Sequence, residues 1–241
     1  MMKGIPDNSI DMILCDLPYG TTDCKWDSII PFEPLWEQYN RIIKDNGAIV
    51  LFSAQPFTTR LINSNLKYYR YNWYWKKNNR TGGILSKVQP MRCVEDICVF
   101  YKKKSTYNPQ GLIRLEKPII HNVKGSSVYG TKKNPSIQKY TGYPHHLLEF
   151  KVPAGKERQH PTQKPVELLE YLIKTYTDEK AVVLDNCMGS GSTCVACVNT
   201  NRRYIGFELD KDYFNISRKR LDEAEVKAWF SMISRSLSTI G

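Results

Sequence analysis

The sequence has no long hydrophobic run, no signal-peptide pattern at its start, no internal repeat and no low-complexity tract. A membrane helix needs roughly 18 consecutive apolar residues, so we expect no membrane span. The seven cysteines follow no regular spacing, which argues against a disulfide framework and favours a reducing, cytoplasmic setting. Acidic residues are few, 24 against 35 Lys and Arg, and such a basic balance favours nucleic acid as a partner.

The length and composition suit one α/β domain with an inserted module, because 241 residues, 41% of them hydrophobic, can bury a substantial core. Short apolar runs, typical of buried strands, alternate with segments whose apolar residues have helical spacing. This order predicts a Rossmann-like, doubly wound and mostly parallel sheet. A flexible basic loop is expected over 76–92. We expect strands over residues 10–15, 48–52, 68–75, 95–101, 181–184 and 203–208, and helices over 34–44, 165–173, from 192 onward and over 211–232.

Two of the predicted strands end in an acidic residue at the head of an unusual turn. The turns are Asp16-Leu17-Pro18-Tyr19-Gly20 and Asp185-Asn186-Cys187-Met188-Gly189-Ser190-Gly191. In open α/β sheets, ligands bind where parallel strands surface at their carboxyl ends. We therefore expect the two acidic corners, although distant in sequence, to converge across one crevice.

The second turn has the features of a nucleotide-type cofactor site. Gly189 and Gly191 allow the backbone close approach, and Ser192-Thr193 begin a predicted helix whose amide end favours anionic groups. Glu208 ends the next strand, at about the 20-residue offset expected for an acceptor of ribose hydroxyls. The alternative is a tight strand-to-helix turn followed by a solvated strand end.

The first turn presents a carboxylate and a planar ring side by side, because Pro18 stiffens the segment between Asp16 and Tyr19. A carboxylate that accepts from an amino group and a ring that stacks on a flat base suit an enzyme that holds an extruded nucleobase. The alternative is an ordinary proline-containing loop with a capping aspartate.

Three motifs resemble those of AdoMet-dependent DNA amino methyltransferases of the N6-adenine or N4-cytosine type. Asp16-Leu17-Pro18-Tyr19 resembles the family's Asp-Pro-Pro-Tyr catalytic motif, and residues 185–193 resemble its Asp-Pro-Phe-x-Gly-Ser-Gly-Thr-Thr cofactor motif. His160-Pro161-Thr162-Gln163-Lys164-Pro165 is similar to the segment that precedes the cofactor motif in the permuted β subgroup. Methyltransferases that act on protein glutamine or ribosomal RNA usually carry the cofactor motif first, so they fit less well.

The resemblance implies direct methyl transfer from S-adenosyl-L-methionine, without a metal, to the amino nitrogen of a flipped base. It implies that the Asp16 side chain and the Leu17 carbonyl accept the amino hydrogens, that Tyr19 stacks on the base and that Pro18 fixes the turn. The cofactor residues it implies are Asp185, near the methionine amino group, Glu208, on the ribose hydroxyls, Thr193 and Lys164, as candidates for the methionine carboxylate, and Cys187, Gly189, Ser190 and Gly191 of the turn. His160 is expected to order its loop rather than to do chemistry.

Three departures from the family pattern limit these expectations. Leu17 replaces the first proline of the catalytic motif, and Asn186 and Cys187 replace the proline and phenylalanine of the cofactor motif. Only residues 1–4 precede Ile5, where relatives usually have a short strand and an Asp-containing turn, so either the start is truncated or the first sheet edge is incomplete. A catalytically silent DNA-binding relative therefore remains an alternative to an enzyme. An Asp-initiated motif is more typical of N6-adenine than of N4-cytosine enzymes, so adenine is the favoured base.

The resemblance divides the chain into a catalytic half over 1–101, a basic target-recognition insert over 102–159, an AdoMet-binding half over 160–222 and a C-terminal helical tail over 223–241. Residues 102–164 hold thirteen Lys and Arg but three acidic residues, and they are expected to form loops. Cations there would neutralise phosphates of double-stranded DNA. Four tyrosines are candidates for base or sugar contacts: Tyr107, Tyr129, Tyr140 and Tyr143. The alternative is a solvated basic surface without a partner.

Two points stay open at the level of sequence. Cys194 and Cys197 have the spacing of a redox or metal pair, but they lie on a predicted helix without a second ligand pair, so buried thiols are favoured. Whether the protein is a homodimer, and whether a cognate restriction endonuclease accompanies it, does not follow from these residues.

Overall fold

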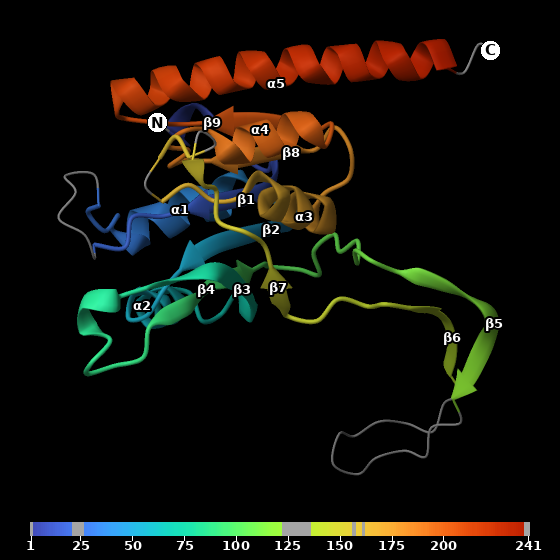
Figure 1. Cartoon of the computed structure of the whole chain (residues 1–241), viewed down its shortest axis with the longest axis horizontal. Helices are drawn as coiled ribbons and strands as arrows, with labels where there is room; N and C mark the ends of the chain where they lie inside the picture. Colours follow the sequence, from blue (N-terminus) through green and yellow to red (C-terminus); the bar gives the residue numbers. More distant parts are fainter. Residues whose placement is uncertain (1, 21–26, 122–135, 156–157, 161, 239–241) are drawn as a thin grey trace. The chain divides into compact units, whose positions relative to one another are not determined.

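The computed structural model describes residues 2–20, 27–121, 136–155, 158–160 and 162–238 (Figure 1). The chain forms two compact units, a main unit of Met1–Asn108 and His146–Gly241 and a small unit of Pro109–His145. Each is described by itself. Among the described residues, no helix is both long and apolar enough to cross a bilayer.

A seven-stranded sheet forms the centre of the main unit, with the strand order β7-β3-β4-β2-β1-β8-β9. Strand β4 runs antiparallel to its neighbours β2 and β3, and all the other neighbouring pairs are parallel. The mostly parallel α/β sheet predicted from the sequence is thereby confirmed. The strands are β1 (Ile10–Asp16), β2 (Ile43–Ser53), β3 (Tyr69–Thr81), β4 (Arg92–Phe100), β7 (Leu147–Glu149), β8 (Val182–Asp185) and β9 (Arg203–Gly206).

Helices cover both faces of this sheet, because buried strands alternate their side chains between two apolar layers. On β1, Met12 and Leu14 pack in a core with α3 and α4, whereas Ile13 and Cys15 pack in a second core with α1 and α2. The long helix α5 lies along α4 (Figure 1) and buries Leu221 against it. The helices are α1 (Phe32–Ile42), α2 (Phe57–Ser64), α3 (Val166–Tyr176), α4 (Ser192–Asn199) and α5 (Lys211–Ser238), with short 3-10 turns η1 (Met2–Gly4) and η2 (Gly83–Leu85).

The direction of winding reverses between β1 and β8. From β1 the chain passes through α1 to β2 on one side of the sheet, and from β8 it passes through α4 to β9 on the other side. Adjacent strands whose connections diverge in this way leave a crevice beyond their carboxyl ends, which is where ligands bind in open α/β sheets. Asp16 is the last residue of β1 and Asp185 is the last residue of β8.

Several elements differ from the sequence prediction. Helix α1 ends at Ile42, before Asn46-Gly47, because Ile43 pairs with Ile10 and so starts β2 early. Strand β3 continues to Thr81, whose pairing with Arg92 turns much of the expected loop into a hairpin. Helix α2 was not predicted, since its eight residues carry a weak pattern and are stabilised by burial of Phe57 and Leu61.

The small unit contains a two-stranded antiparallel ribbon of β5 (Ile113–His121) and β6 (Ser136–Thr141). The expectation of loops here was wrong. Most side chains of both strands are exposed, so the sequence lacks the apolar alternation that marks a half-buried strand. Backbone pairing holds the ribbon, and the pairing is irregular between Arg114 and Ile119, where Pro118 cannot donate a hydrogen bond.

Candidate active site at the switch point of the sheet

The first acidic corner is a network around the Asp16 carboxylate. Tyr19 Oη donates a hydrogen bond to Asp16 Oδ1 at 2.7 Å, and the Tyr19 ring stacks on Phe57 with centroids 5.0 Å apart. Burial, followed by the charge of Asp16, raises the pKa of Tyr19 well above its usual value. The phenol therefore stays neutral and acts as a donor that fixes one side of the carboxylate.

The second acidic corner is a buried carboxylate at the head of the glycine turn. Asp185 is 4% exposed, and its Oδ1 accepts the Cys187 N–H at 3.0 Å. Burial raises the pKa of Asp185 to about 6, and the charge of Asp16 adds to the rise, while hydrogen bonds from Thr193, Cys187 and Cys15 oppose it. A cationic ligand would therefore stabilise the ionised form of Asp185.

The glycine turn after β8 is closed by Glu208. Gly189 and Gly191 have positive φ angles of 51° and 78°, which favour glycine. Glu208 Oε2 accepts the Gly189 N–H at 2.8 Å, and its Oε1 accepts the Asp210 N–H at 2.8 Å. The carboxylate therefore joins the turn after β8 to the end of β9, and each of its oxygens keeps a further lone pair for a hydroxyl donor.

Arg220 on α5 holds the same turn from the other side and was missed by the sequence analysis. Its guanidinium Nη1 donates to the Ser190 carbonyl at 2.6 Å, to Ser190 Oγ at 2.9 Å and to Ser192 Oγ at 3.1 Å. Burial lowers the pKa of Arg220. No local signal distinguishes this arginine from exposed neighbours such as Arg218, since only the packing of α5 on α4 brings it to the turn.

The segment before α3 contacts both corners. Lys164 Nζ lies 2.5 Å from Asp16 Oδ2 and 3.5 Å from Glu95 Oε2, so its ammonium is on the catalytic-motif side rather than on the glycine turn. The His160 ring packs against the Tyr213 ring, with centroids 4.2 Å apart, and its Nδ1 accepts the Thr162 N–H at 3.2 Å. A Cβ on Gly189 would lie 3.7 Å from His160 Cδ2.

The two substituted positions of the cofactor motif are built into the fold. Tyr39 Oη donates to Asn186 Oδ1, and Cys187 packs against the core that contains Cys15. Burial, followed by Cys187, raises the pKa of the Cys15 thiol. Through these contacts, Asn186 and Cys187 join the glycine turn to α1 and β1.

The cysteines at positions 194 and 197 are fully buried on α4. Burial raises the pKa of both thiols, which disfavours the thiolate needed for redox chemistry or metal ligation. In the part of the chain that the structure describes, no cluster of three potential metal ligands is found. Both residues therefore act as small apolar side chains in the packing of α4.

The basic stretch over 102–164 is shared between the two units. Lys102, Lys103 and Lys164 belong to the main unit and have partners there. Lys102 donates to the Asn40 carbonyl at 2.6 Å, Lys103 pairs with Asp45 at 2.6 Å, and Lys164 pairs with Asp16. Tyr107 also lies in the main unit and packs on Tyr176, with ring centroids 6.2 Å apart.

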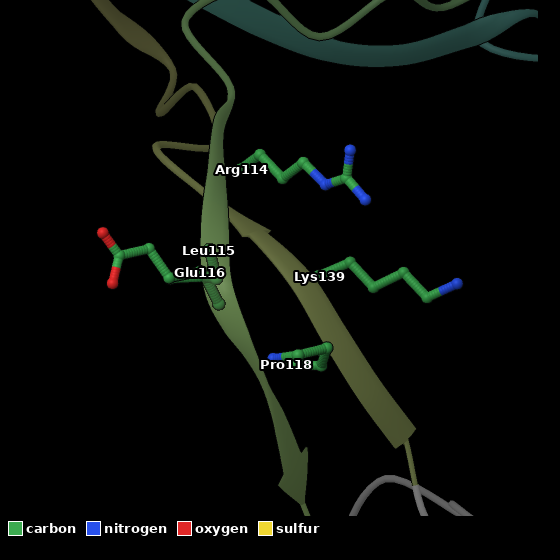
Figure 2. A pocket seen from close by; sticks show the side chains of 5 residues that line it. All are labelled: Arg114, Leu115, Glu116, Pro118 and Lys139. Atoms are coloured by element: carbon green, nitrogen blue, oxygen red, sulfur yellow. The ribbon is translucent and has the colours of Figure 1, made fainter.

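The ribbon of the small unit has charged side chains around a cavity. Arg114 and Lys139 extend from one side of the ribbon and Glu116 from the other (Figure 2), around a cavity of about 430 Å³ that Leu115 and Pro118 complete. Of the small unit's candidate tyrosines, Tyr140 and Tyr143 are 39% and 59% exposed. Tyr129 lies outside the described residues.

Solved structures with the same architecture identify the class of fold. The crystal structure of the M1.HpyAVI–SAM complex matches with a TM-score of 0.58 and 25% identity, covering 88% of this chain and 89% of that one. PvuII DNA methyltransferase (cytosine-N4-specific) matches with a TM-score of 0.64 and 15% identity, covering 94% and 88% of the two chains. The fold is that of a class I AdoMet-dependent DNA methyltransferase, as predicted.

The chain belongs to the DNA methylase family (N6_N4_Mtase), whose model matches residues 10–219. The type II methyltransferase M.HpaI of Haemophilus parainfluenzae is 29% identical over 240 residues, which span 92% of this chain and 71% of the relative. DNA adenine methyltransferase YhdJ of Escherichia coli (strain K12) is 25% identical, over 92% of this chain and 80% of the relative. The predicted family of N6-adenine and N4-cytosine DNA methyltransferases is thereby confirmed.

Proposed function

We propose that the protein transfers a methyl group from AdoMet to the N6 amino group of an adenine flipped out of a specific site in double-stranded DNA. One observation carries the proposal: Asp16 and Asp185 end neighbouring parallel strands at the switch point, beside a glycine turn. This arrangement puts an acceptor for an amino group and an acceptor for a cationic cofactor at one edge of the sheet.

The donor set at the second corner fits AdoMet, which would supply the methyl group when bound. Asp185 is a buried carboxylate whose ionised form a cation would stabilise, so it matches the methionine amino group. Glu208 retains acceptor capacity for the ribose hydroxyls, and Thr193 at the start of α4 is proposed to meet the methionine carboxylate. The turn residues Cys187, Gly189, Ser190 and Gly191 would line this site.

At the first corner, the chain's own groups would prepare the amino nitrogen. The Asp16 carboxylate and the Leu17 carbonyl are proposed to accept the two amino hydrogens, which frees the nitrogen lone pair from the ring. Pro18 fixes the turn, and the face of Tyr19 that is not stacked on Phe57 is proposed to hold the base. Holding nitrogen and methyl carbon about 3 Å apart supplies several kcal/mol through positioning. When bound, AdoMet would supply the methyl group and leave as a neutral thioether, and the proton that the amino nitrogen loses would pass to water.

We propose the basic ribbon of the small unit as a DNA-contacting part of the target-recognition region. A two-stranded ribbon fits the major groove, and Arg114 and Lys139 on one side would neutralise phosphates. The range expected from the sequence, 102–159, also includes segments that lie in the main unit. The type II relatives make a cognate restriction endonuclease a proposed partner as well.

Adenine is proposed over cytosine on two grounds. The catalytic motif begins with aspartate, and the relative YhdJ is named a DNA adenine methyltransferase. N4-cytosine methylation is the second candidate, since the family includes both chemistries.

The test is methyl transfer from labelled AdoMet to DNA, followed by mapping of modified bases in DNA from cells that express the protein. We expect N6-methyladenine in one sequence context. N4-methylcytosine in the same assay would select the second candidate. Tight DNA binding by folded protein without any transfer would support the catalytically silent alternative.

A further inference from the structure

A row of alternating charges extends from the first acidic corner on β1 across the sheet to β3. Asp16 on β1 pairs with Lys164, Lys164 pairs with Glu95 on β4, and Glu95 Oε1 accepts from Lys77 on β3 at 2.9 Å. The side chains of Lys164, Glu95 and Lys77 are 8%, 18% and 9% exposed. Long charged side chains are rarely this buried unless they are paired.

The Lys164 ammonium sits above the strand that separates its two partners. Strand β2 lies between β1 and β4, and its residue Phe52 pairs in register with Asp16. Lys164 Nζ lies 5.1 Å from the centroid of the Phe52 ring, a distance at which the ring face attracts a cation. The ammonium is therefore held by a carboxylate on each side and by an aromatic ring beneath.

Electrostatics favour the charged form of this lysine despite its burial. Desolvation alone would lower the pKa of Lys164, but Asp16 and Glu95 together raise it above its ordinary value. Burial would likewise raise the pKa of Glu95, and Lys164 and Lys77 lower it instead. The charged forms of Lys164 and Glu95 are thus favoured, and each of the two has oppositely charged neighbours in the row.

We infer that Lys164 is the positioning residue for the Asp16 carboxylate, anchored by Glu95, and that it does not bind the carboxylate of the cofactor. The inference rests on the proposed function. Lys164 donates to Asp16 Oδ2 and Tyr19 donates to Asp16 Oδ1, so the carboxylate cannot rotate. Its remaining lone pairs therefore have a fixed direction in which they can accept from an incoming amino group. The ammonium is also a fixed positive neighbour of the Asp16 carboxylate, whose negative charge stabilises the positive charge that develops on the amino nitrogen.

The experiment compares Lys164→Met, Lys164→Arg and Glu95→Gln with the unchanged protein. AdoMet affinity is measured by calorimetry, and kcat and KM are measured by methyl transfer at saturating AdoMet. We expect Lys164→Met to lower kcat about 100-fold, as expected for a misplaced reacting group, with AdoMet affinity unchanged. Lys164→Arg should recover part of kcat because it retains the cation, and Glu95→Gln should lower kcat less than Lys164→Met.

Lys44→Met is the matched control. Lys44 pairs with Asp11 at 2.6 Å, so it also neutralises a carboxylate of β1, but at the opposite end of the strand. We expect its kcat to be unchanged. If Lys164→Met fails to fold because Asp16 and Glu95 are left facing each other, Lys164→Met combined with Glu95→Gln removes that repulsion and is expected to show the same loss of kcat.

Two results would overturn the inference. One is a kcat for folded Lys164→Met equal to that of the unchanged protein. The other is a loss of AdoMet affinity of about tenfold or more, the effect of deleting a charged contact to a ligand, with kcat restored at saturating AdoMet. Failure of the proposed function looks different, because the unchanged protein would then transfer no methyl group to any DNA, and the inference would fall with it.

Discussion

Asp16 and Asp185 end neighbouring parallel strands, and the charge of Asp16 is one of the causes, after burial, that raise the pKa of Asp185 to about 6. Two carboxylates that share one edge of a sheet repel each other, so each is stabilised by a cation. Lys164 supplies that cation for Asp16. For Asp185, the proposed partner is the amino group of the cofactor.

AdoMet affinity should therefore depend on pH. Below pH of about 6 the Asp185 carboxyl becomes protonated and loses its attraction for an ammonium group, so binding should weaken as pH falls through this value. Calorimetric titrations at pH values between 5 and 8, in steps of about one pH unit, would measure the effect. In Asp185→Asn, the affinity should be lower and independent of pH in this window. If the AdoMet affinity of Asp185→Asn still depended on pH, the effect would belong to another group.

The same shift predicts how the stability of the ligand-free protein depends on pH. Because the folded-state pKa of Asp185, about 6, lies above its ordinary value of 3.8, the folded state binds the proton more tightly. This contribution to stability is present below the unfolded value and is lost as pH rises through the folded one. Asp185→Asn should thus be more stable than the unchanged protein at pH 8, by up to about 3 kcal/mol, and similar to it near pH 4. Urea unfolding at both pH values measures this, with the exposed Asp222→Asn as control.

Removal of the catalytic carboxylate should separate chemistry from cofactor binding. Asp16→Ala is expected to abolish methyl transfer and to leave AdoMet binding largely intact, since Asp16 lies on β1 and the glycine turn follows β8. Labelled-methyl transfer and calorimetry on the same preparation measure the two properties. An active Asp16→Ala protein would remove Asp16 from its proposed role.

Arg220 should matter for the cofactor site although it comes from the C-terminal helix. Arg220→Ala removes the nitrogen that donates to the Ser190 carbonyl, Ser190 Oγ and Ser192 Oγ. It leaves the buried Ser190 side chain without this partner, so AdoMet should bind about tenfold more weakly. Arg218→Ala changes an exposed arginine of the same helix and should bind AdoMet normally. Equal affinities for the two variants would show that the turn does not need this support.

The ribbon cations should contribute to DNA affinity through phosphates. Raising salt from low to physiological levels should weaken binding by orders of magnitude, and Arg114→Ala with Lys139→Ala should reduce the slope of log affinity against log salt by about one per residue. Arg218→Ala with Lys219→Ala, which removes two exposed cations of α5, serves as the charge-matched control. An unchanged slope in the double variant would show that Arg114 and Lys139 do not contact DNA phosphates.

The sequence was sufficient for those parts of the fold that depend on local pattern. The strands β1, β8 and β9 and the helix α3 were predicted to within about three residues, because their apolar runs are bounded by glycine, proline or acidic residues. Residues whose state depends on a distant partner were predicted less well. Ile43 joins a strand because Ile10 pairs with it, and Thr81 does so because Arg92 pairs with it.

The same distinction applies to the site. Asp16, Asp185 and Glu208 were found because each follows a short apolar run. Asp16 and Asp185 end β1 and β8, Glu208 lies two residues beyond β9, and the structure brings all three to one edge of the sheet. Arg220 and Glu95 carry no such signal, since a charged residue in a helix or strand is usually solvated. Lys164 was noticed within a motif, but its partners became visible only when β1 and β4 were placed on either side of Phe52.

The parallel pair of β1 and β8 joins the first quarter of the chain to the last quarter. A ribosome completes β1 early and β8 only after most of the message has been translated. Until then, one edge of β1 lacks its permanent backbone partner and presents an apolar template for pairing with other nascent chains. A frameshift or stop codon ahead of β8 should consequently produce an aggregation-prone product that cellular proteases clear, and not a half-functional fragment.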